Sequence, residues 1–243
     1  MRNAERVHDL ISATRELSRK VSRLNFGPPV AHVYNPLDYA WGAHEQYLRR
    51  FGRGPKKVVF LGMNPGPWGM VQTGIPFGEV SVVRDWMGIH EGIQPPARQH
   101  PRRPIFGFDC QRSEISGQRL WKLFSERFGA AEIFFRDHFV VNYCPLAFLE
   151  AGGCNRTPDK LPAPQTAPLY EACDEHLRRT LEVLQPRWAI GIGGFAAKRL
   201  LGIASDLPLQ IGQILHPSPA SPAANRGWAA LAAGQLTDLG VWK

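Results

Sequence analysis

The sequence has few cysteines and no paired cysteine motif. Its cysteines, Cys110, Cys144, Cys154 and Cys173, never occur as CxxC. This spacing argues against a zinc ribbon and against an iron–sulfur cluster, because both need closely paired thiolates. Reduced thiols in an intracellular protein are the favoured interpretation. We therefore expect neither a metal nor a cofactor.

Long apolar runs are also missing. No run approaches the ~18 residues of a membrane-spanning helix, and the N-terminal sequence MRNAERVHDL lacks the apolar centre of a signal peptide. Both absences predict a soluble, intracellular protein with no membrane partner. We expect it in the cytoplasm, at the nucleoid, in a bacterium, or in the nucleus of a eukaryote. We also expect a monomer.

Acidic residues are fewer than basic residues. The chain of 243 residues carries 29 Lys and Arg against 21 Asp and Glu, for a formal net charge of +8. A basic surface fits a polyanionic partner, nucleic acid first. A solvated basic surface with no such partner accounts for the charge equally well, so charge alone leaves both interpretations open.

Short apolar runs alternate with helical patterns. The runs have the length and β-branched content of buried parallel strands, and they span residues 58–62, 139–143, 188–193 and 209–216. Helical patterns cover residues 3–24, 38–52, 114–128, 166–184 and 194–201, with a last helix after Ser221-Pro222. This alternation predicts an α/β fold, a central four-stranded, mostly parallel sheet with helices on both faces. We expect one domain, 1–243, with 1–25 as an N-terminal helical extension.

Residues 88–113 are rich in Pro, Arg and His. We expect them to form a long ordered excursion that contacts a ligand. A disordered linker is the alternative, and it is disfavoured because Ile105, Phe106 and Phe108 give the segment apolar surface to bury.

Polar residues stand where the predicted strands end. Asn64 and Asn142 follow or close the first two strands, and His216 closes the fourth. Open α/β sheets bind ligands at the carboxyl ends of their strands, so these three side chains should face one crevice. The phosphate-loop pattern GxxxxGK[ST] is absent. The third strand ends in GIGG, which a tight strand-to-helix turn explains better than a dinucleotide site.

These groups predict binding of a planar polar molecule rather than nucleophilic catalysis. No Ser, Cys or Lys nucleophile stands beside a base, since Ser218 and His216 are too close in sequence to face each other readily. The amide of Asn142 can donate one hydrogen bond and accept another, which suits a pyrimidine edge, and Phe77 could stack on the ring. Each residue also has an ordinary structural explanation, as a turn, core or cap residue. Their joint placement favours a site.

Two segments resemble a known family. GMNPGPWGMVQTGIPFGEV (62–80) and HPSPASPAANRGW (216–228) are similar to the two motifs of the single-strand-selective monofunctional uracil-DNA glycosylases, a branch of the uracil-DNA glycosylase superfamily. The similarity extends from about residue 26 to 230 and includes YNPLDYAW, HPRRPIFGFDCQRSEISGQRLW and VVNYCPLAFL. The first motif is long and specific. Neighbouring branches carry Asp or Glu where this chain has Asn64.

The resemblance implies catalytic and base-binding residues. It implies that Asn64 positions the attacking water, and that His216 donates a hydrogen bond to uracil O2 as the base departs. Asn142 would read uracil by accepting from N3–H and donating to O4, and Phe77 would stack on the base. The family surrounds the 5-position of the base with the counterparts of Met63, Gly66 and Met70.

The second motif implies contacts with DNA. Its Pro-Ser-rich turn, Pro217, Ser218, Pro219 and Ala220, would enter the duplex as a wedge, and Arg226 would contact phosphate. Vertebrate members carry an arginine at the position of Ala220, so a weaker wedge is expected here. Arginines that are further candidates for contacts with the DNA backbone are Arg102, Arg103 and Arg112.

The implied function is DNA base-excision repair. Such an enzyme hydrolyses the N-glycosidic bond of uracil and of 5-modified uracils, such as 5-hydroxymethyluracil, in single- or double-stranded DNA. Neither motif contains the lysine that a Schiff base needs, so the product should be an intact strand with an abasic site. Two alternatives are a catalytically weak module that binds damaged DNA and an enzyme of free nucleosides. The basic charge disfavours the second alternative.

Overall fold

The computed structural model describes residues 3–243 and is built on a four-stranded parallel sheet. The strands run in the order β3-β2-β6-β7, and every neighbouring pair is parallel. Their bounds are β2 (Val58–Gly62), β3 (His138–Asn142), β6 (Trp188–Ile192) and β7 (Gln210–Ile214). The predicted fold class and all four predicted strands are therefore confirmed, with small shifts at the strand ends.

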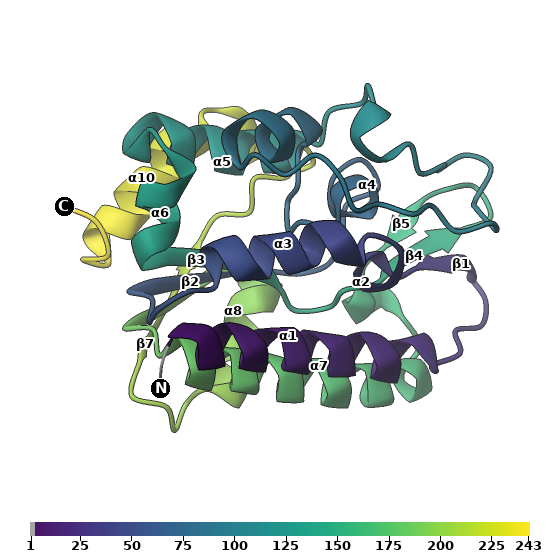
Figure 1. Cartoon of the computed structure of the whole chain (residues 1–243), viewed down its shortest axis with the longest axis horizontal. Helices are drawn as coiled ribbons and strands as arrows, with labels where there is room; N and C mark the ends of the chain where they lie inside the picture. The colour runs from purple at the N-terminus through teal and green to yellow at the C-terminus, as the bar shows by residue number, and fades with distance from the viewer. Residues whose placement is uncertain (1–2) are drawn as a thin grey trace.

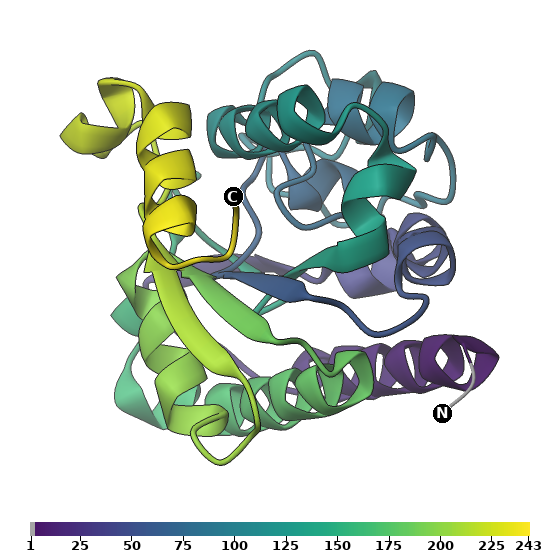
Figure 2. The same ribbon diagram turned by 90° about the vertical axis from the view of Figure 1, so that its left-hand side faces the viewer.

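Helices cover both faces of this sheet (Figure 2). One face carries α1 (Asn3–Ser22), α7 (Ala163–Leu184) and α8 (Gly194–Ile203). The other carries α5 (Ile115–Phe128), α6 (Ala131–Asp137) and α10 (Trp228–Asp238). All residues of β2 and β3 are buried, as expected for strands of a parallel sheet that helices cover on both faces. Within the described residues, no helix is long and apolar enough to cross a membrane.

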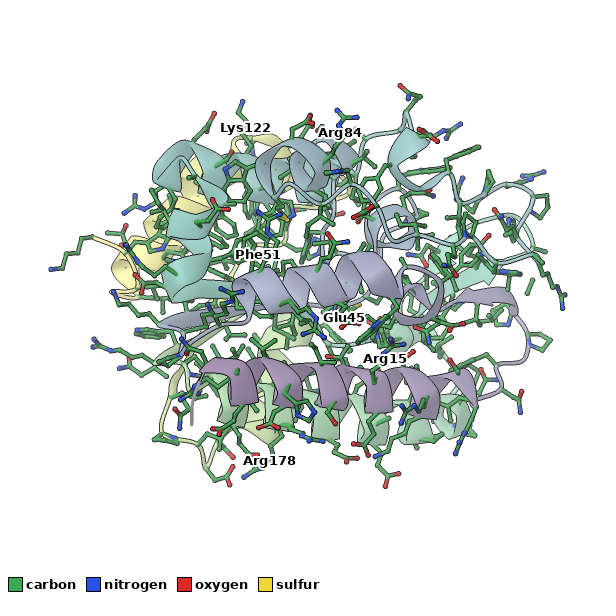
Figure 3. The ribbon with its side chains drawn as sticks, in the orientation of Figure 1. Arg15, Glu45, Phe51, Arg84, Lys122 and Arg178 are labelled. Atoms are coloured by element: carbon green, nitrogen blue, oxygen red, sulfur yellow. The ribbon has the colours of Figure 1, made fainter. Side chains whose placement is uncertain are left out.

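The N-terminal helix α1 packs along α7 (Figure 1). Its apolar stripe includes Leu10, Leu17 and Val21, which belong to the main hydrophobic core. Arg15 of α1 lies 3.6 Å from the centre of the Trp41 ring and pairs with Glu45 over 3.8 Å, as Figure 3 shows for the two labelled charges. Residues 1–2 of the expected extension lie outside the described residues.

The predicted helix over 38–52 is two helices. They are α2 (Pro36–Tyr39) and α3 (Trp41–Phe51), which ends before Gly52 as predicted, and the chain leaves helical geometry at Ala40 between them. The last predicted helix is likewise divided into α9 (Pro222–Asn225) and α10. Gly227 separates them with a φ of 114°, which interrupts a right-handed helix. Ser221 caps α9 by accepting a hydrogen bond from the backbone N–H of Ala224.

A second sheet was not predicted. It has three antiparallel strands in the order β1-β4-β5, namely β1 (Val30–Tyr34), β4 (Ala147–Glu150) and β5 (Asn155–Arg156). These strands are short, and β1 pairs with a segment more than a hundred residues away in sequence. The sheet adjoins the loop after β2, because Asn155 Nδ2 donates to the backbone oxygen of Pro65 over 2.9 Å.

The segment 88–113 is anchored to the same loop region. The side chain of the buried Gln72, in α4 (Met70–Thr73), accepts from the backbone N–H of Phe106 over 2.8 Å and donates to the backbone oxygens of Pro67 and Pro104. The segment is thus an ordered excursion, as predicted. Its burial pattern differs from the expectation at one position, because Ile105 is buried while Phe106 is 52% exposed. The phenylalanine points away from the core that its neighbour fills.

Candidate active site

The predicted strand ends meet at one cavity. It has a volume of about 290 Å³ and is lined by Met63, Asn64, Pro65, Gly66, Phe77, Glu114, Ser116, Asn142, Asn155, Thr157, His216 and Ser218. The parallel sheet brings these residues together because the carboxyl ends of β2, β3 and β7 lie at one edge. Residues more than 150 positions apart in sequence therefore share one wall.

Asn64 stands on a rigid loop. Its Nδ2 donates to the backbone oxygen of Leu146 over 3.3 Å, which fixes the amide and leaves Oδ1 as the group able to accept from a water molecule. The backbone oxygen of Gly66 accepts from the N–H groups of Gly69 and Val71, which closes the loop onto α4. The two prolines, Pro65 and Pro67, restrict the backbone between these contacts.

Asn142 lies at the end of β3 and is 8% exposed. Its Nδ2 donates to Sδ of Met70 over 3.3 Å, and its Oδ1 has no hydrogen-bond partner among the described residues. A buried acceptor without a partner is costly and needs an explanation. Met70 is buried beside Asn142 and does not line the cavity. Met70 therefore contacts Asn142 but does not itself line the cavity.

Phe77 adopts an uncommon backbone conformation. Its φ is 55°, in the left-handed region that few non-glycine residues enter. Its backbone oxygen accepts from Trp121 Nε1 over 3.1 Å and from the N–H of Glu79 over 2.8 Å. A Cβ on Gly117 would lie 2.0 Å from that oxygen, so glycine allows α5 to approach. These contacts hold the Phe77 ring 6.0 Å from the His216 ring, centre to centre.

Gly62 leaves room for two site residues. A Cβ at this position would lie 2.3 Å from Oδ1 of Asn142 and 2.4 Å from the ring of Phe77. Gly62 and Asn142 are partners in the register of β2 and β3. Glycine is therefore required at position 62, because a side chain there would collide with Asn142 and Phe77.

His216 is held as a neutral ring. Its Nδ1 accepts from the backbone N–H of Ser218 over 3.1 Å, so Nε2 carries the proton. Burial lowers the pKa of His216 below its ordinary value. Gly193 packs against this residue with a φ of 89°, and α8 starts directly after it. The GIGG segment is a tight strand-to-helix turn, as predicted.

The second motif forms an exposed turn beside the cavity. Ser218 lines the cavity wall, while Pro219, Ala220 and Arg226 are exposed. The buried Pro217 accepts a hydrogen bond at its backbone oxygen from Arg119 Nη1 over 3.1 Å.

Arg119 also fixes the far end of this turn. Its Nη2 donates to Oδ1 of Asn225 over 2.9 Å, and Nδ2 of Asn225 donates to the backbone oxygen of Pro219. Sequence reasoning missed Arg119, which carries no local signal on α5.

Glu114 was also missed. Its carboxyl group lies against the loop after β2, because a Cβ on Gly66 would be 2.2 Å from Glu114 Oε2 and one on Gly69 would be 2.8 Å from its Cγ. Burial raises the pKa of Glu114, and the backbone N–H groups of Ser116 and Trp68 oppose that shift. The only sequence signal was a glutamate at the start of the predicted helix over 114–128. Among residues 3–243, no three His, Cys, Asp or Glu side chains are placed to hold a metal ion.

The chain is similar to known proteins over most of its length. The family model described as uracil DNA glycosylase superfamily matches residues 50–233. The chain is 47% identical over 229 residues to a single-strand selective monofunctional uracil-DNA glycosylase of Rattus norvegicus, covering 93% of this chain and 82% of the relative. It is 48% identical over 227 residues to the Bos taurus protein of that name, covering 93% and 84%.

A solved structure has the same fold. The crystal structure of wild-type Pedobacter heparinus SMUG2 superposes with a TM-score of 0.65 at 16% identity, covering 94% of this chain and 97% of that one. The fold and the site define a member of the uracil-DNA glycosylase superfamily. Within it, the chain belongs to the single-strand-selective monofunctional branch, so the family resemblance is confirmed.

Proposed function

We propose that the cavity receives a uracil or 5-modified uracil flipped out of DNA and hydrolyses its N-glycosidic bond. The observation that carries this proposal is the buried, unpartnered Oδ1 of Asn142 in the wall of a cavity that Phe77 and His216 also line. Family membership supports it, because the chain is a monofunctional uracil-DNA glycosylase by descent. The product is an abasic site in an intact strand.

Asn142 and Phe77 select the base. Oδ1 of Asn142 accepts from N3–H of uracil, and its second Nδ2 hydrogen donates to O4, while the first stays on Met70. Cytosine has an acceptor at N3 and a donor on C4. In the same pose its N3 would face the acceptor Oδ1 of Asn142 and its amino group would face the donor Nδ2, so it is rejected. Phe77 covers one face of the ring, and its fixed backbone limits the reorganisation needed on binding.

His216 stabilises the departing base. Cleavage of the bond places negative charge on the uracil, and Nε2–H of His216 donates to O2, where part of that charge develops. Nδ1 is already occupied by the Ser218 N–H, so the ring acts as a neutral donor. The hydrogen bond strengthens as charge grows, which favours the transition state over the bound substrate.

Asn64 positions the attacking water. An amide is not basic, so Oδ1 orients the water toward C1′ of the sugar, while Nδ2 remains bonded to Leu146. The N-glycosidic bond breaks and the uracil departs as an anion, while the water adds its oxygen to C1′ and releases its proton to solvent, from which the uracil is protonated afterwards. No lysine lines the cavity as described, so no group there can form a Schiff base with the sugar.

The exposed turn at Pro217–Ala220 supports the flipped nucleotide. Extrusion costs a few kcal/mol in a duplex and less in a single strand. Ala220 presents only a methyl group at the tip. We therefore expect the enzyme to cleave uracil fastest where the base is already unpaired. We propose that it acts as a monomer, inside the cell, on the DNA of the nucleoid or nucleus.

The variant Asn64→Ala tests this assignment. Its single-turnover cleavage of a uracil-containing oligonucleotide should fall by about 10²-fold, as loss of positioning does, with an unchanged dissociation constant by fluorescence anisotropy. Gln213→Ala, at an exposed amide on β7, is the matched control. Wild-type cleavage by Asn64→Ala would refute the catalytic assignment. A wild-type protein that binds such DNA without cutting it would instead be a damage-binding module.

A further inference from the structure

A second hollow of the surface lies beside the N-terminal helix, and the proposed reaction does not use it. It has a volume of about 320 Å³, and three arginines line it, namely Arg15 and Arg19 on α1 and Arg23 directly after that helix. The three recur every four residues, so about 6 Å of helix axis separates each from the next on one face. The hollow therefore carries a row of evenly spaced cations.

This hollow continues into a larger one at the edge strand β1. The two share Ser22 and Asp38, and the second, of about 470 Å³, adds Arg98 from the segment 88–113. We call the two together the arginine groove. Four arginines line it against one carboxylate, that of Asp38, among the lining residues that the structure describes. The groove is therefore positively charged along its length.

The cations at the centre of the groove are not neutralised by the fold. On the side of α1 that faces α7, Lys20 pairs with Glu16 and with Glu175. The guanidinium groups of Arg19 and Arg23 are exposed, and neither has a hydrogen bond or an ion pair within residues 3–243. A guanidinium group binds phosphate through two parallel hydrogen bonds. A hollow lined by unpaired guanidinium groups thus suits a chain of phosphates.

The antiparallel sheet connects the groove to the cavity of the candidate active site. Asn155 on β5 lines that cavity, and all residues of β1 line the groove, two strands away in the order β1-β4-β5. Neighbouring strands are about 4.8 Å apart, so the two edges of the sheet are separated by about 10 Å. Leu146 joins the two places, because it lines the groove while its backbone oxygen holds Nδ2 of Asn64. A strand with one base in the cavity can reach the groove within a few nucleotides.

We propose that the arginine groove binds the phosphate backbone of the DNA strand on one side of the flipped nucleotide. This inference rests on the proposed function and gives the enzyme a second DNA-binding surface. Backbone contacts carry no sequence information, so the groove adds affinity for any strand that is long enough to reach it. A duplex is stiff over this distance, with a persistence length of about 150 base pairs. The groove therefore favours a flexible single strand.

The test compares a short and a long single strand that each carry one uracil. Single-turnover kcat/KM is measured on strands of about 8 and about 30 nucleotides, and the long strand is made with the uracil near either end. The double variant Arg19→Gln/Arg23→Gln should lower kcat/KM on one of the two long strands by about five- to tenfold. It should leave the short strand unchanged. The slope of log kcat/KM against log salt on that long strand should decrease by about 0.7 for each arginine removed.

Two further double variants control for charge and for structure. Arg136→Gln/Arg187→Gln removes the same charge from exposed arginines that precede β3 and β6, at the opposite ends of the strands, and should behave as the wild type. Arg19→Lys/Arg23→Lys keeps the charge and should retain most of the advantage of the long strand. Arg15 is left in place, because its guanidinium group also stacks on the ring of Trp41.

The length of the substrate separates groove binding from the chemistry in the cavity. If Arg19→Gln/Arg23→Gln matches the wild type on both long strands, with the same salt slope, the groove is overturned and the proposed function stands. An equal loss on short and long strands would also overturn it, because a short strand does not extend into the groove. A wild-type enzyme that cleaves none of these strands would overturn both proposals.

Discussion

The backbone N–H of Ser218 donates to Nδ1 of His216 over 3.1 Å. This bond within the His-Pro-Ser sequence fixes the ring tautomer, so Nε2 is the donor. Burial lowers the pKa of His216, which also favours the neutral ring. Two independent features of the fold thus favour a neutral hydrogen-bond donor over a cation.

The pH dependence of cleavage should follow from this pair. Protonation of Nδ1 would break the bond from Ser218 and disturb the motif turn. Since the pKa of His216 lies below its ordinary ~6.5, the single-turnover rate should be constant from pH 7 to 9 and fall only in more acidic buffer. His216→Ala should lower the plateau by about 10²–10³-fold. A rate that is highest below pH 6 would show that the cation is the active form.

Gly62→Ala should damage the site without unfolding the protein. The new methyl group would meet Oδ1 of Asn142 and the ring of Phe77, at 2.3 and 2.4 Å. We expect kcat/KM on uracil to fall by about 10²-fold, as misplaced site groups do, with a native circular dichroism spectrum. Gly234→Ala is the control, because it adds a methyl group on α10 with no neighbouring atom within 4 Å. Equal activity of the two variants would contradict the role of Gly62.

Arg103 and Arg112 should contribute to DNA affinity. They lie 5.1 and 4.5 Å from the centre of the Trp68 ring, on the loop that also lines the cavity. Each Ala variant should weaken binding of single-stranded DNA and reduce the slope of log affinity against log salt by about 0.7–1. Arg187→Ala is the control, because Arg187 precedes β6 at the opposite end of the strands. An unchanged slope in both variants would remove these arginines from the interface.

Stability should fall in weak acid because several histidines are buried as neutral rings, among them His44 and His138. His44 bonds the backbone oxygen of Gly74, and His138 accepts from Trp242 Nε1. Burial lowers the pKa of each to about 4, while the unfolded chain binds protons near pH 6.5. The free energy of unfolding should therefore be level above pH 7 and decrease between pH 6.5 and 4.

The expected loss at pH 5 is on the order of 2 kcal/mol for each ring. Urea titrations at pH 7.5 and pH 5 measure it, and His138→Gln should remove about 2 kcal/mol of the difference, the share of one ring. Equal unfolding free energies at the two pH values in the wild-type protein would show that these rings are charged, or solvated, in the folded state.

The parallel sheet could be predicted because its strands are continuous apolar runs. Val59, Phe60 and Leu61 are completely buried, and burial on both faces produces that sequence signature. The antiparallel sheet could not, since β5 has two residues and β1 pairs with a distant segment. The break at Ala40 was also hidden, because both flanking helices keep apolar residues in helical spacing.

Some residues of the site could be predicted from the sequence and others could not. Asn64, Asn142 and His216 follow the rule that ligands bind at the carboxyl ends of parallel strands. Glu114 and Asn155 reach the cavity from the start of α5 and from β5, so that rule does not find them. Met70 was expected at the base from its place in the motif, yet it lies beside Asn142, outside the cavity wall.

Cleavage of a labelled oligonucleotide with one uracil tests the central claim most directly. The oligonucleotide is offered single-stranded and paired opposite G and A, and each sample is divided before alkali treatment. The account predicts strand breaks at uracil alone, only after alkali, with the single strand cleaved fastest because Ala220 provides a small wedge. Breaks without alkali, or intact DNA in every sample, would contradict it.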